Sequence, residues 1–321
     1  MLTPADDYVH PVGPELNFNE SMYFHFHDPV RRLGGFLRLA NRPNERRGER
    51  TVCLYLPSGS IGFGFTRPEF AEVKHFRAAG MSIECIEPYQ RLRVAFKGTV
   101  NVVGDPSAMF DPKAALSSCP VVDCTVLFNL TALAPVYAET FDGDGQSFAP
   151  NHYEQLMSVA GSVRLGDQTY PIDGQGLRDH SWGARSWQAP WFYRWLHGSS
   201  PTLGFMGTFF GDEDGGHRTG GFVWDSEGVH QCDDVIVATV RDAEHQPQTV
   251  SVELTGPDQR WTFTGEAQTS VPLRHRTADG ATATRIAEAC MTWSNADGTR
   301  LHGMAEYLDQ MADGVPVGLH V

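Results

Sequence analysis

The chain is dominated by short runs in which apolar and polar residues alternate, which is the pattern of β-strands with one buried face. Turn-forming clusters such as Pro57-Ser58-Gly59 and Asp297-Gly298 separate these runs. Strands and turns at this spacing are typical of an antiparallel sandwich or barrel. The expected strands are 22–27, 35–40, 51–56, 61–65, 91–96, 121–130, 159–165, 205–210, 234–240, 250–254, 261–264 and 286–293.

Two stretches depart from the strand pattern. Phe70, Val73 and Phe76 recur at helical spacing, which predicts a helix over 68–79. Residues 140–150 are rich in Asp, Gly and Ser, and all 7 tryptophans follow them. We therefore predict two domains, residues 1–150 and residues 151–321, each close to the roughly 150 residues of an ordinary single-core domain.

The composition indicates a folded chain, since 41% of its residues are hydrophobic. Its net charge is −14, with the acidic excess concentrated in the second half, so we expect no nucleic-acid partner. No apolar run approaches the ~18 residues of a membrane span, and no leader is visible, which favours a cytoplasmic protein. The 6 cysteines form no CxxC pair and are expected to be reduced.

The richest group of reactive side chains lies in residues 173–187, around Asp179-His180-Ser181-Trp182-Gly183. On a strand, His180 and Trp182 share one face while Asp179 takes the other. The neighbouring glycines, Gly174 and Gly176, predict a sharply bent backbone. A neutral imidazole can take a proton from water, and an indole face stabilises a cation by ~1 to 2 kcal/mol when desolvated. The group therefore suits carbocation chemistry, or else it is a structural clasp with Trp as core filler.

A second candidate is the segment that carries Tyr23, His25 and His27, which project from one face of an extended strand. No third metal ligand follows nearby, so we expect Tyr23 and His25 to line a polar end of a cavity instead. The paired glycines at 62–64 and 174–176 lack the rest of a dinucleotide-binding loop. We expect neither a metal nor an organic cofactor.

The run from Gly176 to Trp187 resembles the signature of AttH-like, tandem lipocalin-fold proteins related to the carotenoid 1,2-hydratases (hydroxyneurosporene synthases). Similar segments at 19–23, 152–155 and 305–307 extend the resemblance over nearly the whole chain. It implies an all-β fold of two lipocalin-like antiparallel β-barrel domains packed together, with an apolar cavity and no organic cofactor. Members of the group hydrate isoprenoid double bonds, and related two-barrel folds act as pericyclases.

The resemblance also implies site residues. His180 and Trp182 correspond to the catalytic His and Trp, whereas Phe210 and Asp212 stand where the group has Tyr and Asp, so the phenol is missing here. The hypothesis is hydration of an alkene in a hydrophobic small molecule, or dehydration of a tertiary alcohol. Asp179 or Asp212 protonates the alkene carbon, and His180 deprotonates the attacking water.

Trp182 and Trp195 would stabilise the cation in this scheme. The residues expected to line the substrate site are Tyr23, His25, Trp187, Tyr193, Trp195 and Phe210. Three other classes stay open, because one fold hosts many functions: a pericyclase or isomerase, a non-catalytic carrier of an apolar ligand, and a metal-dependent enzyme.

Overall fold

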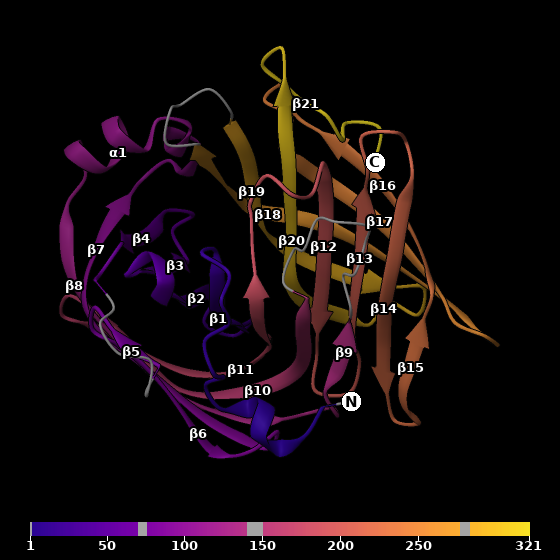
Figure 1. Cartoon of the computed structure of the whole chain (residues 1–321), viewed down its shortest axis with the longest axis horizontal. Coiled ribbons are helices and arrows are strands. Elements are labelled where there is room, and N and C mark those ends of the chain that lie inside the picture. Colours follow the sequence, from indigo (N-terminus) through magenta and orange to yellow (C-terminus); the bar gives the residue numbers. More distant parts are fainter. Residues whose placement is uncertain (1, 70–75, 140–149, 277–282) are drawn as a thin grey trace. The chain divides into compact units, whose positions relative to one another are not determined.

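The structure, a computed structural model, describes residues 2–69, 76–139, 150–276 and 283–321. Most of these residues lie in antiparallel strands (Figure 1), which confirms the all-β prediction. Each expected strand falls within an observed one, except that the third ends one residue early, at Tyr55. The chain divides into two compact units, Met1–Gly104 with Leu116–Ser186 and Asp105–Ala115 with Trp187–Val321.

The sheet of the first unit closes on itself. Its strands follow the order β4-β3-β2-β1-β11-β10-β8-β7, and β4 pairs again with β7. Figure 1 shows these strands, in indigo to magenta, following one another around a ring. Such an antiparallel ring is the architecture of a lipocalin-like barrel. Its elements are η1 (Pro4–Asp7), β1 (Phe18–Asp28), β2 (Leu33–Arg42), η2 (Pro43–Glu45), β3 (Arg47–Tyr55), β4 (Ile61–Thr66), β5 (Arg77–Ala78), β6 (Met81–Glu87), β7 (Arg91–Val103), β8 (Val121–Ala132), β9 (Tyr137–Glu139), β10 (Asn151–Leu165) and β11 (Gln168–Ala184).

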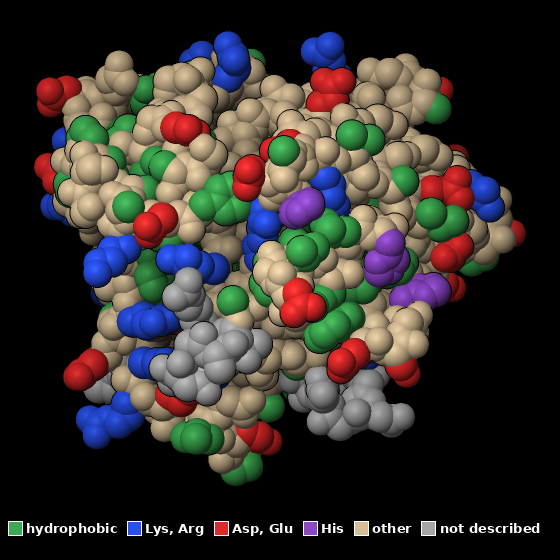
Figure 2. Space-filling model, turned by 90° about the horizontal axis from the view of Figure 1, so that it is seen from above, with side chains coloured by type: hydrophobic (Ala, Val, Ile, Leu, Met, Phe, Trp, Pro, Cys, Tyr) green, Lys and Arg blue, Asp and Glu red, His purple; other side chains and the backbone are tan. Residues whose placement is uncertain are grey.

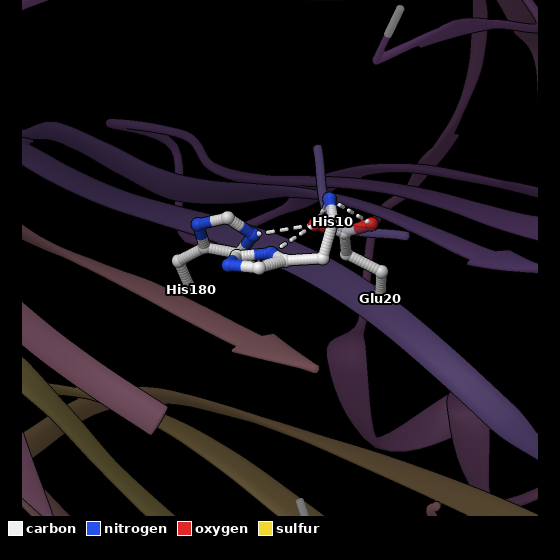
Figure 3. A group of neighbouring side chains, drawn as sticks. All are labelled: His10, Glu20 and His180. Atoms are coloured by element: carbon white, nitrogen blue, oxygen red, sulfur yellow. Dashed lines mark hydrogen bonds and ion pairs between the residues drawn. The ribbon is translucent and has the colours of Figure 1, made fainter. Parts of the chain in front are cut away.

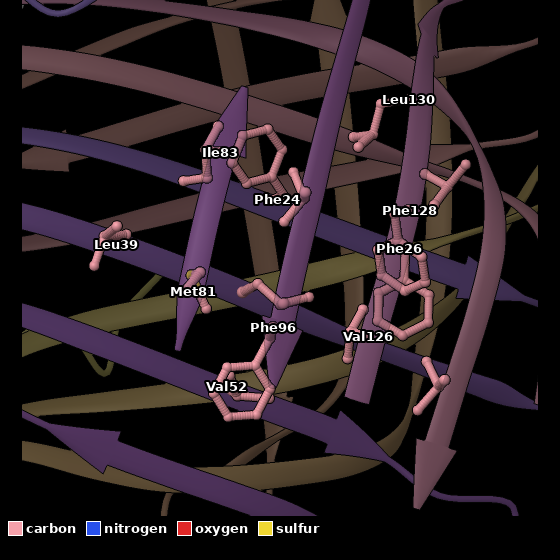
Figure 4. Close-up of a cluster of buried hydrophobic side chains, with 14 of the residues drawn as sticks. Phe24, Phe26, Leu39, Val52, Met81, Ile83, Phe96, Val126, Phe128 and Leu130 are labelled. Carbon is pink, nitrogen blue, oxygen red and sulfur yellow. The ribbon is translucent and has the colours of Figure 1, made fainter. Parts of the chain in front are cut away.

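One face of each strand in the ring points inward and forms the core of this unit (Figure 4). Phe24, Phe26, Phe96 and Phe128 are buried there, with the rings of Phe26 and Phe128 4.6 Å apart. A fully buried Phe stabilises the fold by about 1.5 to 3 kcal/mol, so the inward face holds the unit together. Every residue of β1 is buried, on both of its faces.

The second unit is built on another antiparallel sheet, in the order β15-β14-β13-β12-β20-β19-β18-β17-β16, with β21 beside β20. Its core includes Phe205 and Phe263, whose rings stack 4.1 Å apart, and the fully buried Trp293. The elements are η3 (Pro106–Phe110), β12 (Phe192–Ser199), β13 (Gly204–Gly211), β14 (His217–Asp225), β15 (Gly228–Cys232), β16 (Asp234–Arg241), β17 (Pro247–Thr255), β18 (Arg260–Arg276), β19 (Ala283–Asn295), β20 (Arg300–Ala312) and β21 (Val315–Pro316).

The helix expected over 68–79 is not what the described residues form there. Residues 70–75 lie outside the described part, and the end of the segment is the short strand β5. In the described part of the chain an α-helix occurs instead at α1 (Pro112–Ser118), which the sequence analysis did not predict. Among the described residues, none of the helices has both the length and the apolarity needed to cross a bilayer.

The first unit extends beyond the boundary expected at residue 150. β10 and β11 lie between β1 and β8 in the closed sheet, so residues 151–186 belong to the first unit. The expected seam at 140–150 falls almost entirely outside the described residues.

On the face of the molecule in Figure 2, acidic and basic side chains are spread among apolar ones.

Candidate active site

The segment around His180 lies in one long strand, β11, rather than in the sharp bend that its glycines predicted. A Cβ atom at Gly176 would lie 1.9 Å from the carbonyl oxygen of His25, and one at Gly174 would lie 2.1 Å from that of His27. These glycines therefore admit the backbone of β1 at close range. The prediction of a bend was wrong because the glycines serve strand packing.

Alternation along β11 places His180 and Trp182 on one face and Asp179 on the other, as expected for a strand. His180 pairs with Met22 of β1, and Trp182 pairs with Glu20. Met22 belongs to the hydrophobic core of the first unit, so His180 and Trp182 point toward the inside of the barrel.

Three side chains meet at this point: His10, from the segment before β1, Glu20 and His180 (Figure 3). Glu20 Oε1 lies 2.9 Å from His10 Nδ1 and 3.1 Å from His180 Nε2. The backbone N–H of His10 also donates to Glu20, at 3.0 Å from Oε1. Glu20 and His180 are fully buried, whereas 13% of the His10 side chain is exposed. One carboxylate oxygen therefore joins two imidazole rings.

Trp182 completes the cluster with an aromatic face. Its ring stacks on the His10 ring, with centroids 3.7 Å apart and planes inclined by 11°. The centroid of His180 lies 5.2 Å from that of Trp182, and both side chains approach Tyr153. Trp182 is half-buried, so the cluster reaches solvent at Trp182 and His10.

A second buried network adjoins the first through Tyr153. Its hydroxyl lies 3.2 Å from His180 Nδ1 and donates to Asp7 Oδ1 at 2.6 Å. Arg178 donates to the same Asp7 oxygen at 2.5 Å and to Gln155 Oε1 at 2.7 and 2.9 Å. The N-terminal segment is thus tied to the inside of the barrel by a buried ion pair as well as by His10.

The pKa values of the two acids, Glu20 and Asp7, are both lowered, although burial by itself would raise them. Burial would raise the pKa of Glu20, but hydrogen bonds from His10 and His180 and their charges outweigh it and lower that pKa. Burial would likewise raise the pKa of Asp7, yet the charge and hydrogen bonds of Arg178, with those of Tyr153, lower it. Both carboxyl groups are held in their ionised form.

The pKa values of the two imidazoles, His180 and His10, are shifted in opposite directions. Burial lowers the pKa of His180, and the contact with Glu20 only partly offsets this. Burial also acts to lower the pKa of His10, but hydrogen bonds and charges from Glu20 and Asp6 raise it overall. The Nε2 of His10 lies 3.2 Å from Asp6 Oδ1, so both of its nitrogens face carboxylates. Neighbouring groups with pKa values pushed apart are the usual arrangement of a proton donor and a proton acceptor.

Several expected site residues of the first unit lie on another face. Tyr23 and His25 are buried on the side of β1 that points away from Glu20 and Met22, and Tyr23 stacks on Phe36 at 5.3 Å. Asp179 Oδ2 lies 3.4 Å from His152 Nε2. By strand alternation, Tyr23, His25 and Asp179 therefore lie on the face of the sheet opposite to His180.

The remaining expected residues lie in the second unit, where the structure groups some of them. Tyr193 donates a hydrogen bond to Glu306, and its ring lies 5.3 Å from that of Phe210. Trp195 points to the same side of β12 as Tyr193, with its ring 5.1 Å from His197. Trp187 lies apart, stacked on His275 at 4.5 Å.

Asp212 lies in the turn between β13 and β14, and 47% of its side chain is exposed. It forms an ion pair with Arg218 at 3.5 Å. The expected role as proton donor required a carboxyl group whose pKa is raised by burial. The Asp212 side chain is half-exposed and does not meet this requirement of burial.

The sequence matches a known family along most of its length. Residues 3–311 fit the family described as "Domain of unknown function (DUF7064)". The chain belongs to the DUF7064 family. No curated protein matches the chain in sequence.

Solved structures similar to this DUF7064 chain include kievitone hydratase from Nectria haematococca, at 9% identity and a TM-score of 0.59, covering 98% of this chain and 96% of that one. CghA with Sch210972 has 10% identity and a TM-score of 0.57, with 97% and 96% covered. CghA in another structure has 10% identity and a TM-score of 0.56, with 96% and 95% covered. At these identities the likeness concerns the fold, and it confirms the resemblance to tandem lipocalin-like proteins.

In this DUF7064 chain, sequence reasoning missed the partners of His180. Glu20 is separated from His180 by 160 positions, and His10 lies in a segment without a strand pattern. Glu20 carried one usable signal, because it is an acid on the face of β1 that also carries Met22, Phe24 and Phe26. His10 carried none, since a single histidine in an irregular segment is ordinary.

Proposed function

We propose that this chain is a hydratase or dehydratase that acts on an alkene or tertiary alcohol of a hydrophobic, isoprenoid-like small molecule. The reaction would proceed by acid–base chemistry without an organic cofactor. The supporting observation is the His180 imidazole, which is paired with Glu20 and lies 5.2 Å from the Trp182 ring on the inward face. The fold is shared with a protein named kievitone hydratase, which is consistent with this reaction class.

Hydration needs a proton for one alkene carbon and a base for water. As the C–H bond forms, positive charge develops on the second carbon, and the π-face of Trp182 stabilises it by ~1 to 2 kcal/mol. The water oxygen then bonds to that carbon and gives its proton to His180. Glu20 orients the His180 ring and stabilises the imidazolium that forms, as carboxylates do in other His-based sites.

His10 takes the part of proton donor in place of Asp179 and Asp212. It is the partly exposed imidazole of the cluster, and its two nitrogens face Asp6 and Glu20. The proton that His180 gains can return to His10 across Glu20 Oε1, which contacts both rings. The cycle then leaves the protein unchanged. Dehydration follows the same steps in reverse.

The test uses isotopically labelled water. The protein is incubated with a panel of isoprenoid alkenes, and products are examined by mass spectrometry for oxygen taken from water. We expect labelled alcohol from the wild type and none from His180→Gln, with circular dichroism unchanged. His230→Gln, which removes an imidazole paired with Asp225 at 2.9 Å in the second unit, should keep full activity.

Two outcomes would contradict the proposal. Equal turnover by His180→Gln and wild type would remove His180 from the mechanism. Turnover of a substrate without incorporation of labelled oxygen would indicate an isomerase or pericyclase instead.

A non-catalytic carrier is the second candidate, because Glu20 and His180 are completely buried and satisfy each other by hydrogen bonds. A carrier would bind an apolar ligand saturably and release it unchanged.

A further inference from the structure

The inner atoms of the cluster converge in a way that the proposed reaction does not require. His10 Nδ1, Glu20 Oε1 and His180 Nε2 all lie within 4.8 Å of one another. Among the residues that the structure describes, this is the one group of His, Cys, Asp or Glu side chains with three such atoms. We propose that these three side chains bind a divalent cation of the zinc type.

The distances from Glu20 Oε1 to the two imidazole nitrogens are close to those between neighbouring ligand atoms of a metal site, and all three atoms lie within 4.8 Å of one another. Zinc bound tetrahedrally to His nitrogen and carboxylate oxygen at about 2.0 to 2.2 Å keeps its ligand atoms about 3.3 Å apart. Glu20 Oε1 lies 2.9 Å from one imidazole nitrogen and 3.1 Å from the other. A cation would take the place of the hydrogens in these two contacts, and Glu20 Oε1 would move away from each nitrogen by a few tenths of an ångström.

The ring nitrogens that do not face Glu20, His10 Nε2 and His180 Nδ1, provide independent support for a metal site. A histidine that binds a metal usually has its other ring nitrogen held by a carboxylate or another polar group, which fixes the ring. His10 Nε2 lies 3.2 Å from Asp6 Oδ1. His180 Nδ1 lies 3.2 Å from the Tyr153 hydroxyl, which is itself held by Asp7. Both imidazoles thus present their remaining nitrogen to the same point.

The donor set indicates which cations fit. Two imidazoles and one carboxylate suit Zn²⁺, Co²⁺ and similar borderline ions, whereas Mg²⁺ and Ca²⁺ prefer sites made of oxygen. Three protein ligands leave a coordination position for water or another small ligand. The site would therefore discriminate against the hard cations.

The cation and the proposed hydratase chemistry compete for the same atoms. A metal on His180 Nε2 occupies the nitrogen that contacts Glu20, so it would inhibit the reaction. Binding itself is measured on the protein without substrate, and its outcome is therefore independent of the proposed function.

The experiment measures binding of Zn²⁺ and Co²⁺ to the full chain after removal of any purification tag. Isothermal titration gives the stoichiometry and affinity for Zn²⁺, and visible absorption of bound Co²⁺ reports its coordination. We expect one ion per chain for the wild type. Glu20→Gln should weaken binding more than about 100-fold, because it removes a ligand. Asp6→Asn, which alters only the group behind His10, should weaken it about 10-fold.

The matched control is His230→Gln, since His230 and Asp225 pair at 2.9 Å and, within the described ranges, belong to no group of three potential ligands. This variant should bind Zn²⁺ like the wild type. The proposal is overturned if the wild type binds no Zn²⁺, or if Glu20→Gln binds it equally well. Because Glu20→Gln could disturb folding, the milder Asp6→Asn decides independently: unchanged Zn²⁺ affinity and Co²⁺ spectrum in that variant would also count against the site.

Discussion

Arg178 is the clearest case in which one residue depends on its partners. Its side chain is 1% exposed, and Asp7 is its charged partner at 2.5 Å. Removing one member of a buried pair leaves the other charge without compensation, which is far more costly than losing a surface pair. The contact joins the N-terminal segment to β11, so its strength decides how firmly that segment is held.

We predict that Asp7→Ala lowers the free energy of unfolding by about 3 to 5 kcal/mol. Arg93→Ala is the control, because Arg93 and Glu84 are half-exposed and pair at 3.2 Å on the surface. Surface pairs contribute at most about 1 kcal/mol. Urea unfolding of both variants measures the difference. Similar, small losses of unfolding free energy in the two variants would show that the buried pair of Asp7 and Arg178 stabilises the fold no more than a surface pair does.

The same pair predicts how stability depends on pH. The pKa of Asp7 is lower in the folded chain, because Arg178 and Tyr153 outweigh the effect of burial. Asp7 therefore stabilises the fold above the unfolded-state pKa of about 3.9, and this contribution disappears as pH falls through the lower, folded value. The gap in unfolding free energy between wild type and Asp7→Asn should be full at neutral pH and shrink below about pH 4. A gap that stays constant under acid would contradict this assignment.

Among the elements, β11 determines the geometry of the site. Its regular alternation could be predicted from the sequence, and it correctly placed His180 and Trp182 on one face. The function of the glycines in β11 could not be predicted from the sequence. It depends on the close approach of β1, which lies about 150 residues earlier in the chain. The glycines predicted a sharply bent backbone, whereas the structure shows that Gly176 is needed because a side chain there would overlap the backbone of β1.

We predict that Gly176→Ala destabilises the protein by about 1 to 3 kcal/mol or more, the usual range for forced overpacking. The added carbon would meet the backbone of His25 at 1.9 Å, so β1 and β11 would have to separate. Gly104→Ala, where the added carbon meets nothing within 4 Å, should change stability little. Chemical denaturation distinguishes the two. Equal effects would mean that the strands are not tightly apposed.

The end of the segment 68–79, which the sequence predicted to be helical, shows the limit of local periodicity. Its apolar spacing is helical, yet its last residues pair as a strand with β6. Pairing with a neighbouring strand outweighs a weak helical pattern, since most of the stability of an element comes from tertiary packing.

On the scale of the whole molecule, the strand order decides which residues fold together. The sequence supported two similar parts and an all-β fold, but composition alone put the boundary near residue 150. Tryptophan content changes there, whereas the hydrogen-bonded ring continues through β10 and β11 to Ala184. A boundary set by long-range strand pairing leaves no mark in local composition.

We predict that a fragment of residues 1–186 forms the closed sheet of the first unit, while a fragment of residues 1–150 does not. Without β10 and β11, the ring opens and two long edges lose their partners. Amide hydrogen exchange is the measurement: protected strands are expected in the longer fragment only. Equal protection in both would place residues 151–186 outside the first cooperative unit.

The central claim is that His180, Glu20 and Trp182 form the reactive site together with His10. The most direct test is a crystal structure of the protein with a hydrophobic compound that it binds or turns over. We expect the alkene or alcohol carbon to lie against the Trp182 ring, with its oxygen or a water within hydrogen-bond reach of His180 or His10. A ligand bound elsewhere, with all contacts between His10, Glu20 and His180 undisturbed, would contradict the account.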